Sequence, residues 1–273
     1  MEKFSQYKYC VEPFTEDFCG NLSWGNLGNL VLRCASLHAG EHGFGYPQMI
    51  ALHHAWVLSR LVIDMETLPC SGEDFYIETW VDRLYRQFTD RHFSIMRPDG
   101  TAYGHATSIW ALIDTATRMP ADLEKLPNGG FSNVLIPERP APIKPMGRMR
   151  MKDATLVHQH KAVYTDLDIN GHVNSIRYIE MLLNFFPAEE MKLHPAKRIE
   201  MAYCLEAYCG DLLDIYHCLD EKDDTRHLFE IRNGDKTIVK MLLKTPVIDA
   251  ILKEKILTAL IESFGGRFYE IIV

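Results

Sequence analysis

The sequence lacks any run of about 18 consecutive apolar residues, which a membrane-spanning helix requires. Its first ten residues do not have the charged, apolar and small-residue segments of a signal peptide. We therefore expect a cytoplasmic protein without a membrane anchor. The 273 residues, of which 47% are hydrophobic and 24% charged, are typical of one large globular domain or two modest ones.

The sequence also lacks a Cys-x-x-Cys pair. Its seven cysteines are odd in number and scattered, which argues against both a disulfide framework and a structural zinc site. His158 and His160 alternate on an expected strand and could bind a metal with His172, but no cysteine or carboxylate has the spacing to join them. We therefore expect reduced thiols and neither a metal nor a cofactor.

An excess of positive charge is absent as well. The formal net charge of −8 disfavours nucleic-acid binding, which needs a positive surface. One basic segment runs from Arg139 to Lys152 among prolines and Gly147, residues typical of an extended linker. It is either a solvated connector or a strip that docks an acidic partner. In both cases it is the best candidate for a domain boundary.

On either side of this linker the sequence repeats itself. Residues 72–110 and 210–244 both run from a glycine and an acid through a strand, a strand containing Arg-His, a glycine turn and a further strand. The two Arg-His pairs begin at Arg91 and Arg226. The tight turns and the β-branched and aromatic residues around them predict an antiparallel meander in each half.

Ahead of each meander the apolar spacing predicts a helix, at 24–38 in the first half and 173–185 in the second. Further strands are expected at 7–14, 51–68, 155–164 and 197–207. The pattern predicts an α+β protein in which each half is a curved antiparallel sheet wrapped around a central helix. The expected domains are 1–136 and 153–245, joined by the linker 137–152, with an accessory helix and tail at 246–273.

The second helix is preceded by the most informative segment, Asp166-Leu-Asp-Ile-Asn-Gly-His-Val-Asn. It places Asp168, Asn170 and His172 on alternate residues just before the helix, whose first amides attract negative charge. Three groups that can handle protons or bind a substrate are therefore expected close together. The same residues also fit a simple turn, in which Asp168 or Asn170 caps the helix.

Together with Tyr178, this segment resembles the signature Asp-Leu-Asp-x-Asn-x-His-Val-Asn-Asn-x-x-Tyr of acyl-acyl carrier protein thioesterases, a double hotdog family. Further matches, in family order, are Gly43-Phe-Gly, Trp56-Val-Leu-Ser-Arg, Ile77-Glu-Thr-Trp and Ala106-Thr-Ser-Ile-Trp. The resemblance implies a tandem hotdog fold, with an acyl-chain tunnel in the first domain and the catalytic residues in the second. It also implies a bacterial form, because plant members carry an N-terminal targeting extension.

The resemblance further implies that Asp168, Asn170 and His172 are catalytic together with a glutamate from the family's Tyr-x-x-Glu-Cys segment. Tyr203-Cys-Leu-Glu matches this segment, so the glutamate is Glu206 here. The next residue, often cysteine in plant members, is Ala207 here. A mechanism that needs a thiol nucleophile at that position is therefore not available.

Thioester hydrolysis needs an activated water and a stabilised oxyanion. We expect Glu206 or Asp168 to activate the water and His172 to help transfer its proton. Asn170 would hold the thioester or the water, and backbone amides near Val173 would stabilise the oxyanion. Direct attack by Asp168 is the alternative that the sequence leaves open. Asp168→Asn and Glu206→Gln are each expected to lower turnover by about 10²-fold or more.

The function implied by the resemblance is hydrolysis of acyl-acyl carrier protein, which releases a free fatty acid and ends fatty acid synthesis. The acidic carrier protein would contact the basic linker or Arg83, Arg86 and Arg91. The alternatives are an acyl-CoA thioesterase and a non-catalytic acyl-binding protein. The sequence does not fix the preferred acyl chain, and it leaves a monomer and a homodimer open.

Overall fold

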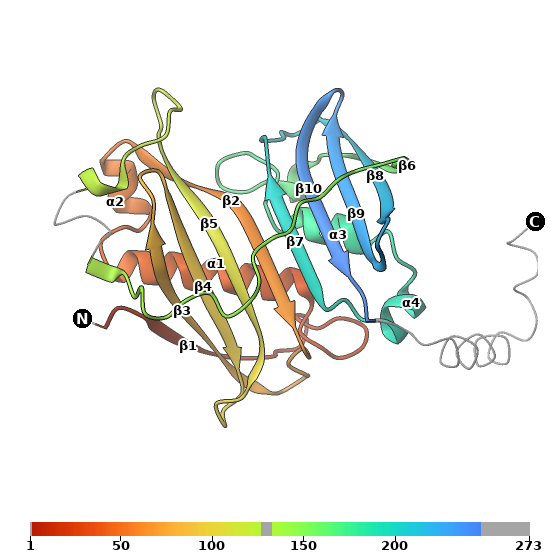
Figure 1. The fold of residues 1–273 in the computed structure, drawn as a ribbon, viewed down its shortest axis with the longest axis horizontal. Helices are drawn as coiled ribbons and strands as arrows, with labels where there is room; N and C mark the ends of the chain where they lie inside the picture. The colour runs from red at the N-terminus through yellow and green to blue at the C-terminus, as the bar shows by residue number, and fades with distance from the viewer. Residues whose placement is uncertain (1, 127–132, 247–273) are drawn as a thin grey trace, which may run out of the picture.

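The structure, a computed structural model, describes residues 2–126 and 133–246. Its ten strands form one sheet in the order β1-β3-β4-β5-β2-β7-β10-β9-β8-β6 (Figure 1). The main helices of the two halves, α1 and α3, contact each other against one face of this sheet. The α+β prediction and the predicted pair of sheet-wrapped helices are therefore confirmed.

Each half has the same order of elements. The first half contains β1 (Ser5–Cys10), α1 (Trp24–Glu41), α2 (Tyr46–Ala51), β2 (His54–Met65), β3 (Asp74–Leu84), β4 (Phe88–Met96), β5 (Ala102–Asp114) and the short 3-10 helix η1 (Leu123–Lys125). The second half contains β6 (Thr155–Lys161), the 3-10 helix η3 (Tyr164–Asp166), α3 (Arg177–Leu183), α4 (Ala188–Leu193), β7 (Arg198–Tyr203), β8 (Leu212–Asp220), β9 (Asp223–Asn233) and β10 (Lys236–Lys244).

The two half-sheets join edge to edge. β2 pairs with β7 in antiparallel fashion, from Arg60 opposite Ala202 to Asp64 opposite Arg198. This pairing leaves β2 and β7 without free edges, so each half covers an edge that would otherwise expose unpaired backbone groups. The internal repeat therefore builds one continuous sheet.

Strand pairing shows which residues of the two halves correspond. Arg91 on β4 lies opposite Val81, and His227 on β9 lies opposite Leu219. Val81 and Leu219 are equivalent, because each lies nine residues after the glycine that begins its repeat, Gly72 or Gly210. The structural counterpart of Arg91 is therefore His227, one residue beyond Arg226, which the Arg-His pairs suggested. The side chain of Arg91 is buried among the residues under α1, hydrogen-bonded to His38 on that helix.

Helix α1 begins as predicted and runs one turn further. Ser23 caps it by accepting a hydrogen bond from the amide of Asn26. The second helix is shorter than predicted, because α3 starts only at Arg177. The amide of Val173 is bound by the carbonyl of Ala207 at 2.8 Å, which holds the preceding residues in an extended bridge instead of a helical turn.

The two helices approach closely because α1 has glycines where they meet. A Cβ atom on Gly25 would lie 2.5 Å from Oε1 of Glu180, and one on Gly28 would lie 2.8 Å from Cδ1 of Ile176. Neither distance can be accommodated without movement. One hydrophobic core consequently continues from the first half into the second.

The linker between the halves crosses the opposite face of the sheet (Figure 1). The indole of Trp80 donates to the carbonyl of Arg139 at 2.8 Å, and the guanidinium of Arg139 stacks on the Trp80 ring and pairs with Glu78. The amide of Gly147 donates to Glu200 in the second half at 3.1 Å. The linker is thus packed against both halves.

No helix among residues 2–126 and 133–246 is long and apolar enough to cross a membrane. The accessory helix expected within residues 246–273 lies outside the described residues, apart from residue 246.

Candidate active site

The signature segment folds as a tight turn held by Asp168. Its Oδ1 accepts hydrogen bonds from the amides of Asn170 at 2.8 Å and His172 at 3.2 Å, and its own amide donates to the carbonyl of His172 at 2.8 Å. Gly171 has a φ of 77°, a left-handed conformation that glycine adopts without strain. The aspartate therefore shapes the turn that displays Asn170 and His172.

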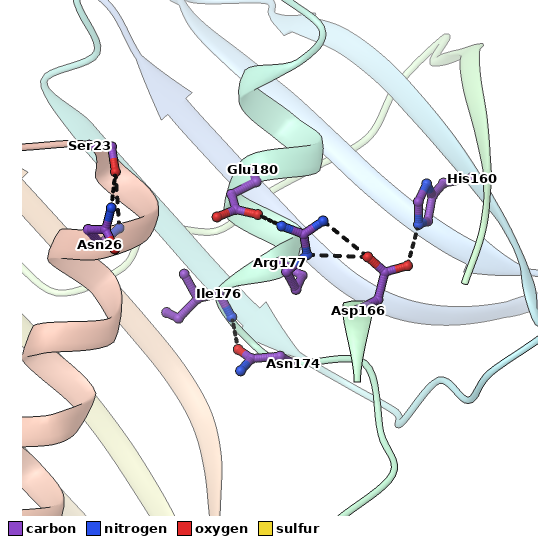
Figure 2. A network of polar contacts seen from close by, with 8 residues as sticks. All are labelled: Ser23, Asn26, His160, Asp166, Asn174, Ile176, Arg177 and Glu180. Atoms are coloured by element: carbon purple, nitrogen blue, oxygen red, sulfur yellow. Dashed lines mark hydrogen bonds and ion pairs between the residues drawn. The ribbon is translucent and has the colours of Figure 1, made fainter. Parts of the chain in front are cut away.

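A buried carboxylate anchors the base of this turn. The side chain of Asp166 is 1% exposed and accepts hydrogen bonds from His160 at 2.7 Å and from Nε and Nη2 of Arg177, each at 3.2 Å. Figure 2 shows Arg177 bridging Asp166 and Glu180, with His160 bound to the other oxygen of Asp166. His160, which the sequence offered as a metal ligand, is thus part of this network.

Burial alone would raise the pKa of Asp166, but the hydrogen bonds from the Val163 amide and His160, with the Arg177 guanidinium, lower it below its ordinary value. The carbonyl of Asp166 also accepts the amide of Asn174 at 2.8 Å, which closes the turn. The side chain of Asn174 in turn accepts the amide of Ile176 at 2.8 Å. Asn174 therefore shapes the backbone.

Glu206 lies just beyond β7 and meets the turn from the other side. Its Oε2 is 3.6 Å from Nε2 of His172 and accepts a hydrogen bond from the hydroxyl of Tyr208 at 2.9 Å. Its Oε1 accepts a hydrogen bond from Nη2 of Arg118 at 2.6 Å. The structure thus brings His172 and Glu206 together and adds two residues that the sequence reasoning did not single out.

The pKa of Glu206 lies below its ordinary value. Burial would raise it, but the hydrogen bonds from Arg118 and Tyr208, together with the charges of His172 and Arg118, outweigh that effect. Glu206 is therefore an anion at neutral pH, with a third of its side chain open to solvent.

A cavity of about 770 Å³ connects these groups. Asp168, Asn170, His172 and Glu206 all line it, so the four residues named from the sequence converge on one space. Its other walls come largely from β2 and β5 of the first half, including Trp56 and Trp110. The site is therefore shared between the halves, although its signature residues come from the second.

A smaller cavity of about 210 Å³ continues from the first beneath α1. Asn170 borders both cavities, as do five residues of the first half, namely Leu32, Tyr46, Ala55, Trp56 and Trp110. Its remaining walls come from the first half, and Ala35, Ala39 and Met49 make its surface mainly apolar. The polar site therefore opens into an apolar pocket of the first half.

Two expectations about the chemistry of the site are wrong. The amides of His172, Val173 and Asn174 are already bound to Asp168, Ala207 and Asp166, so these amides around Val173 are not available to an oxyanion. Arg91 cannot contact a partner protein, because it is 3% exposed. Arg83 and Arg86 remain suitable, with side chains that are 63% and 74% exposed.

The cysteines near the site do not offer an activated thiol. Cys204 borders the larger cavity, but burial raises the pKa of its thiol. Ala207 stands fully buried where plant members of the resembled family often carry a cysteine. Among the described residues, no group of three or more His, Cys, Asp or Glu side chains is arranged to hold a metal ion.

Two family models match the chain, one for each half. The model described as the acyl-ACP thioesterase N-terminal domain matches residues 2–125, and the model of the C-terminal domain matches residues 149–244. The crystal structure of an acyl-ACP thioesterase from Bacteroides thetaiotaomicron VPI-5482 is 39% identical. The superposition covers 89% of this chain and 98% of the Bacteroides protein, with a TM-score of 0.82.

More distant relatives share the fold. The 12:0-ACP thioesterase from Umbellularia californica is 17% identical, with a TM-score of 0.78 over 90% of this chain and 98% of that one. Oleoyl-acyl carrier protein thioesterase 1, chloroplastic, from Arabidopsis thaliana is 28% identical over 69% of this chain and 56% of its own length. The chain spans about half the length of the curated relatives it matches.

Proposed function

This chain belongs to the acyl-acyl carrier protein thioesterase family, and from that premise we propose that it hydrolyses the thioester of acyl-acyl carrier protein and releases a free fatty acid. The observation that carries the proposal is the meeting of Glu206 and His172 in a cavity that continues into an apolar pocket. If the reacting carbonyl lies in the polar cavity, its acyl chain can occupy the apolar pocket.

In the proposed reaction, Glu206 orients and deprotonates a water that attacks the thioester carbonyl. Its lowered pKa keeps it ionised at neutral pH, and its Oε2 faces His172, which helps to move the proton. Asn170, at the junction of the two cavities, would hold the carbonyl or the water. The departing thiolate is a good leaving group and needs little help from an acid.

The hydrogen bonds of Asp168 support Glu206, rather than Asp168, as the base. Oδ1 of Asp168 is bound by two amides of its own turn. Attack by Oδ2 on the thioester would neutralise the carboxylate whose Oδ1 these two amides bind, which disfavours a covalent intermediate on Asp168. We therefore assign Asp168 to the shape of the turn and water activation to Glu206.

The first half, in this proposal, holds the acyl chain. The apolar pocket beneath α1 begins at Asn170 and ends among residues of α1, α2 and β4. Since β2 and β7 already pair the two halves, the chain has the partner that a single hotdog unit would need from a second copy. We therefore favour a monomer over a homodimer, which sedimentation would test.

The test is a product profile. The protein is incubated with a mixed acyl-acyl carrier protein pool, and free fatty acids are measured, with Glu206→Gln as the inactive control. Release by the native protein alone supports the proposal. Equal or faster hydrolysis of acyl-CoA at the same chain length would reassign the donor. Acyl binding with no product release would make the protein a binder and refute hydrolysis.

A further inference from the structure

Arg118 links the two halves at the acid group of the site. It belongs to the first half, in the turn after β5, yet its Nη2 lies 2.6 Å from Oε1 of Glu206 in the second half. Both residues border the larger cavity. A residue that the sequence places 88 positions away therefore touches the proposed base directly.

The turn that carries Arg118 is pinned by Asp114. Oδ1 of Asp114 accepts hydrogen bonds from the amides of Ala116 at 3.0 Å and Thr117 at 2.7 Å, and from the Thr117 hydroxyl at 2.9 Å. The amide of Arg118 donates to the carbonyl of Asp114 at 2.9 Å. These hydrogen bonds hold the backbone of the turn in place up to Arg118.

The backbone of Arg118 adopts a conformation that arginine avoids. Its φ is 60°, in the left-handed region that residues with a Cβ rarely occupy. Such conformations persist where the surrounding structure determines them, and they concentrate at functional sites. Here the strained residue is the one that reaches the proposed base.

The contacts of Glu206 divide its two oxygens. Arg118 holds Oε1, while Oε2 receives the Tyr208 hydroxyl and faces Nε2 of His172. If Arg118 were absent, the carboxylate would lose the contact that fixes Oε1 and would keep only the Tyr208 hydrogen bond and the neighbouring His172. Burial would then raise its pKa with less to oppose it.

We propose that Arg118 is a positioning residue, supplied by the first half, that holds Oε1 of Glu206 so that Oε2 is turned toward His172. The proposal rests on the proposed function for its catalytic meaning. If Arg118 had a purely structural role, replacing it would have little effect on either stability or activity. Its side chain is 57% exposed, and exposed ion pairs add little to stability.

The test compares Arg118→Gln and Arg118→Lys with Lys8→Gln. Lys8 is the matched control, because it also belongs to the first half, is 56% exposed and pairs with a carboxylate, Asp74, at 2.7 Å, but borders neither cavity. For Arg118→Gln we expect kcat to fall about 10-fold, because the carboxylate is no longer oriented. Arg118→Lys should recover part of this loss, and Lys8→Gln should behave as the native protein does.

The pH profile separates positioning from structure. The groups that face Glu206 are Arg118, His172 and Tyr208. Without Arg118 the acid limb of kcat/KM should move to higher pH by about one unit or more, because a nearby positive charge lowers a carboxyl pKa by that amount. The thermal unfolding midpoint should hardly change. An unchanged kcat and acid limb would overturn the proposal, and so would a change in KM alone.

A second readout does not depend on turnover. The ¹³C signal of the Glu206 carboxyl, identified by its loss in Glu206→Gln, is titrated in the native protein, in Arg118→Gln and in Lys8→Gln. We expect a higher pKa only in Arg118→Gln. If the native protein shows no hydrolysis, the proposed function fails while this titration still decides whether Arg118 controls Glu206. Identical titrations in all three proteins would refute that control.

Discussion

The two halves contain the same turn at the entrance to their helices. Oδ1 of Asp17 in the first half accepts the amides two and four residues later at 2.9 and 3.0 Å, and Oδ1 of Asp168 does so at 2.8 and 3.2 Å. Gly20 and Gly171 occupy the same corner, with φ values of 78° and 77°. An aspartate therefore holds this turn in both halves, including the half that lacks the signature.

The side chains displayed by the two turns differ. The amide after the turn binds the carbonyl of Pro69 in the first half and of Ala207 in the second, which aligns the strands beyond. The first half thus has no histidine or carboxylate where the second has its site: Cys19 stands for Asn170, Asn21 for His172 and Leu68 for Glu206. The comparison separates a shared scaffold from three side chains that carry the proposed chemistry.

The largest effect should follow from making the second half resemble the first at its base. Glu206→Gln removes the carboxylate while keeping its shape, and we expect kcat to fall about 10²-fold or more, with KM little changed. The measurement is steady-state release of fatty acid from acyl-acyl carrier protein. Glu73→Gln, which changes a hydrogen-bonded carboxylate of the first half, should leave kcat as it is. Near-native turnover by Glu206→Gln would refute the assignment.

The second effect concerns one histidine in each half, His38, which is buried, and His217, which is partly buried. His38, 1% exposed, has its pKa lowered to about 3, first by burial and then by Arg91. His217 in the second half has its pKa lowered to about 4 by burial and by His227. Because the folded pKa lies below the unfolded value near 6.5, the unfolded state binds more protons at acidic pH. Stability is therefore full above about pH 6.5 and is lost as the pH falls toward these folded values.

As the pH falls from 7.5 to 5, we expect the lowered pKa of His38 to reduce the free energy of unfolding by about 2 kcal/mol. Urea unfolding at the two pH values measures this difference. His38→Gln and His217→Gln should reduce the pH dependence by similar amounts, because folded pKa values of about 3 and about 4 both lie below pH 5. A pH dependence that neither substitution reduces would contradict the lowered pKa values of both histidines.

The third effect tests whether Asp168 does more than Asp17. Asn at either position still offers Oδ1 to the two amides, but it removes the charge. Because Asp168 binds two amides of its own turn, we now expect Asp168→Asn to lower kcat by only about 10-fold instead of the 10²-fold expected from the sequence, and Asp17→Asn to leave kcat unchanged. Fatty acid release and thermal unfolding are measured for both variants. A loss as large as that of Glu206→Gln would give Asp168 a chemical role, contrary to the assignment made here.

Local patterns made most of the fold predictable. The apolar spacing after Ser23 located α1 to within one turn, and the glycine turns located the meanders of both halves. The start of α3 was misjudged because it depends on the bond between Val173 and Ala207, which are distant in the sequence. Helix α2 was not predicted, since its six residues are too few to show a periodic pattern.

The site was predictable only where it is local. Asp168, Asn170 and His172 lie within five residues, so a single sequence segment was enough to predict all three. Glu206 was found through family resemblance alone. Arg118 has no sequence signal, because its role arises from a turn held by Asp114 and from the pairing of β2 with β7, which brings the halves together.

The halves also differ in how the space beside the helix is filled. In the first half, Ala35 and Ala39 of α1 border the 210 Å³ pocket. In the second, the chain just beyond α3 presents Phe185 and Phe186, whose rings lie 5.3 and 6.1 Å from that of Phe229 on β9. His217 and His227 pack against the same rings. Small residues leave a pocket in one half, and aromatic residues pack into a cluster in the other.

Ala35→Phe would make the first half resemble the second, and we expect the smallest effect from it. A ring in the pocket should shift the released fatty acids toward shorter chains by about threefold in their ratio, with a stability cost of about 1–3 kcal/mol from overpacking. Leu37→Phe is the control, because Leu37 is 40% exposed on the same helix and borders neither cavity. A product profile from a mixed acyl-acyl carrier protein pool measures both. If Ala35→Phe is folded and active but releases the native mixture, the acyl chain does not occupy this pocket.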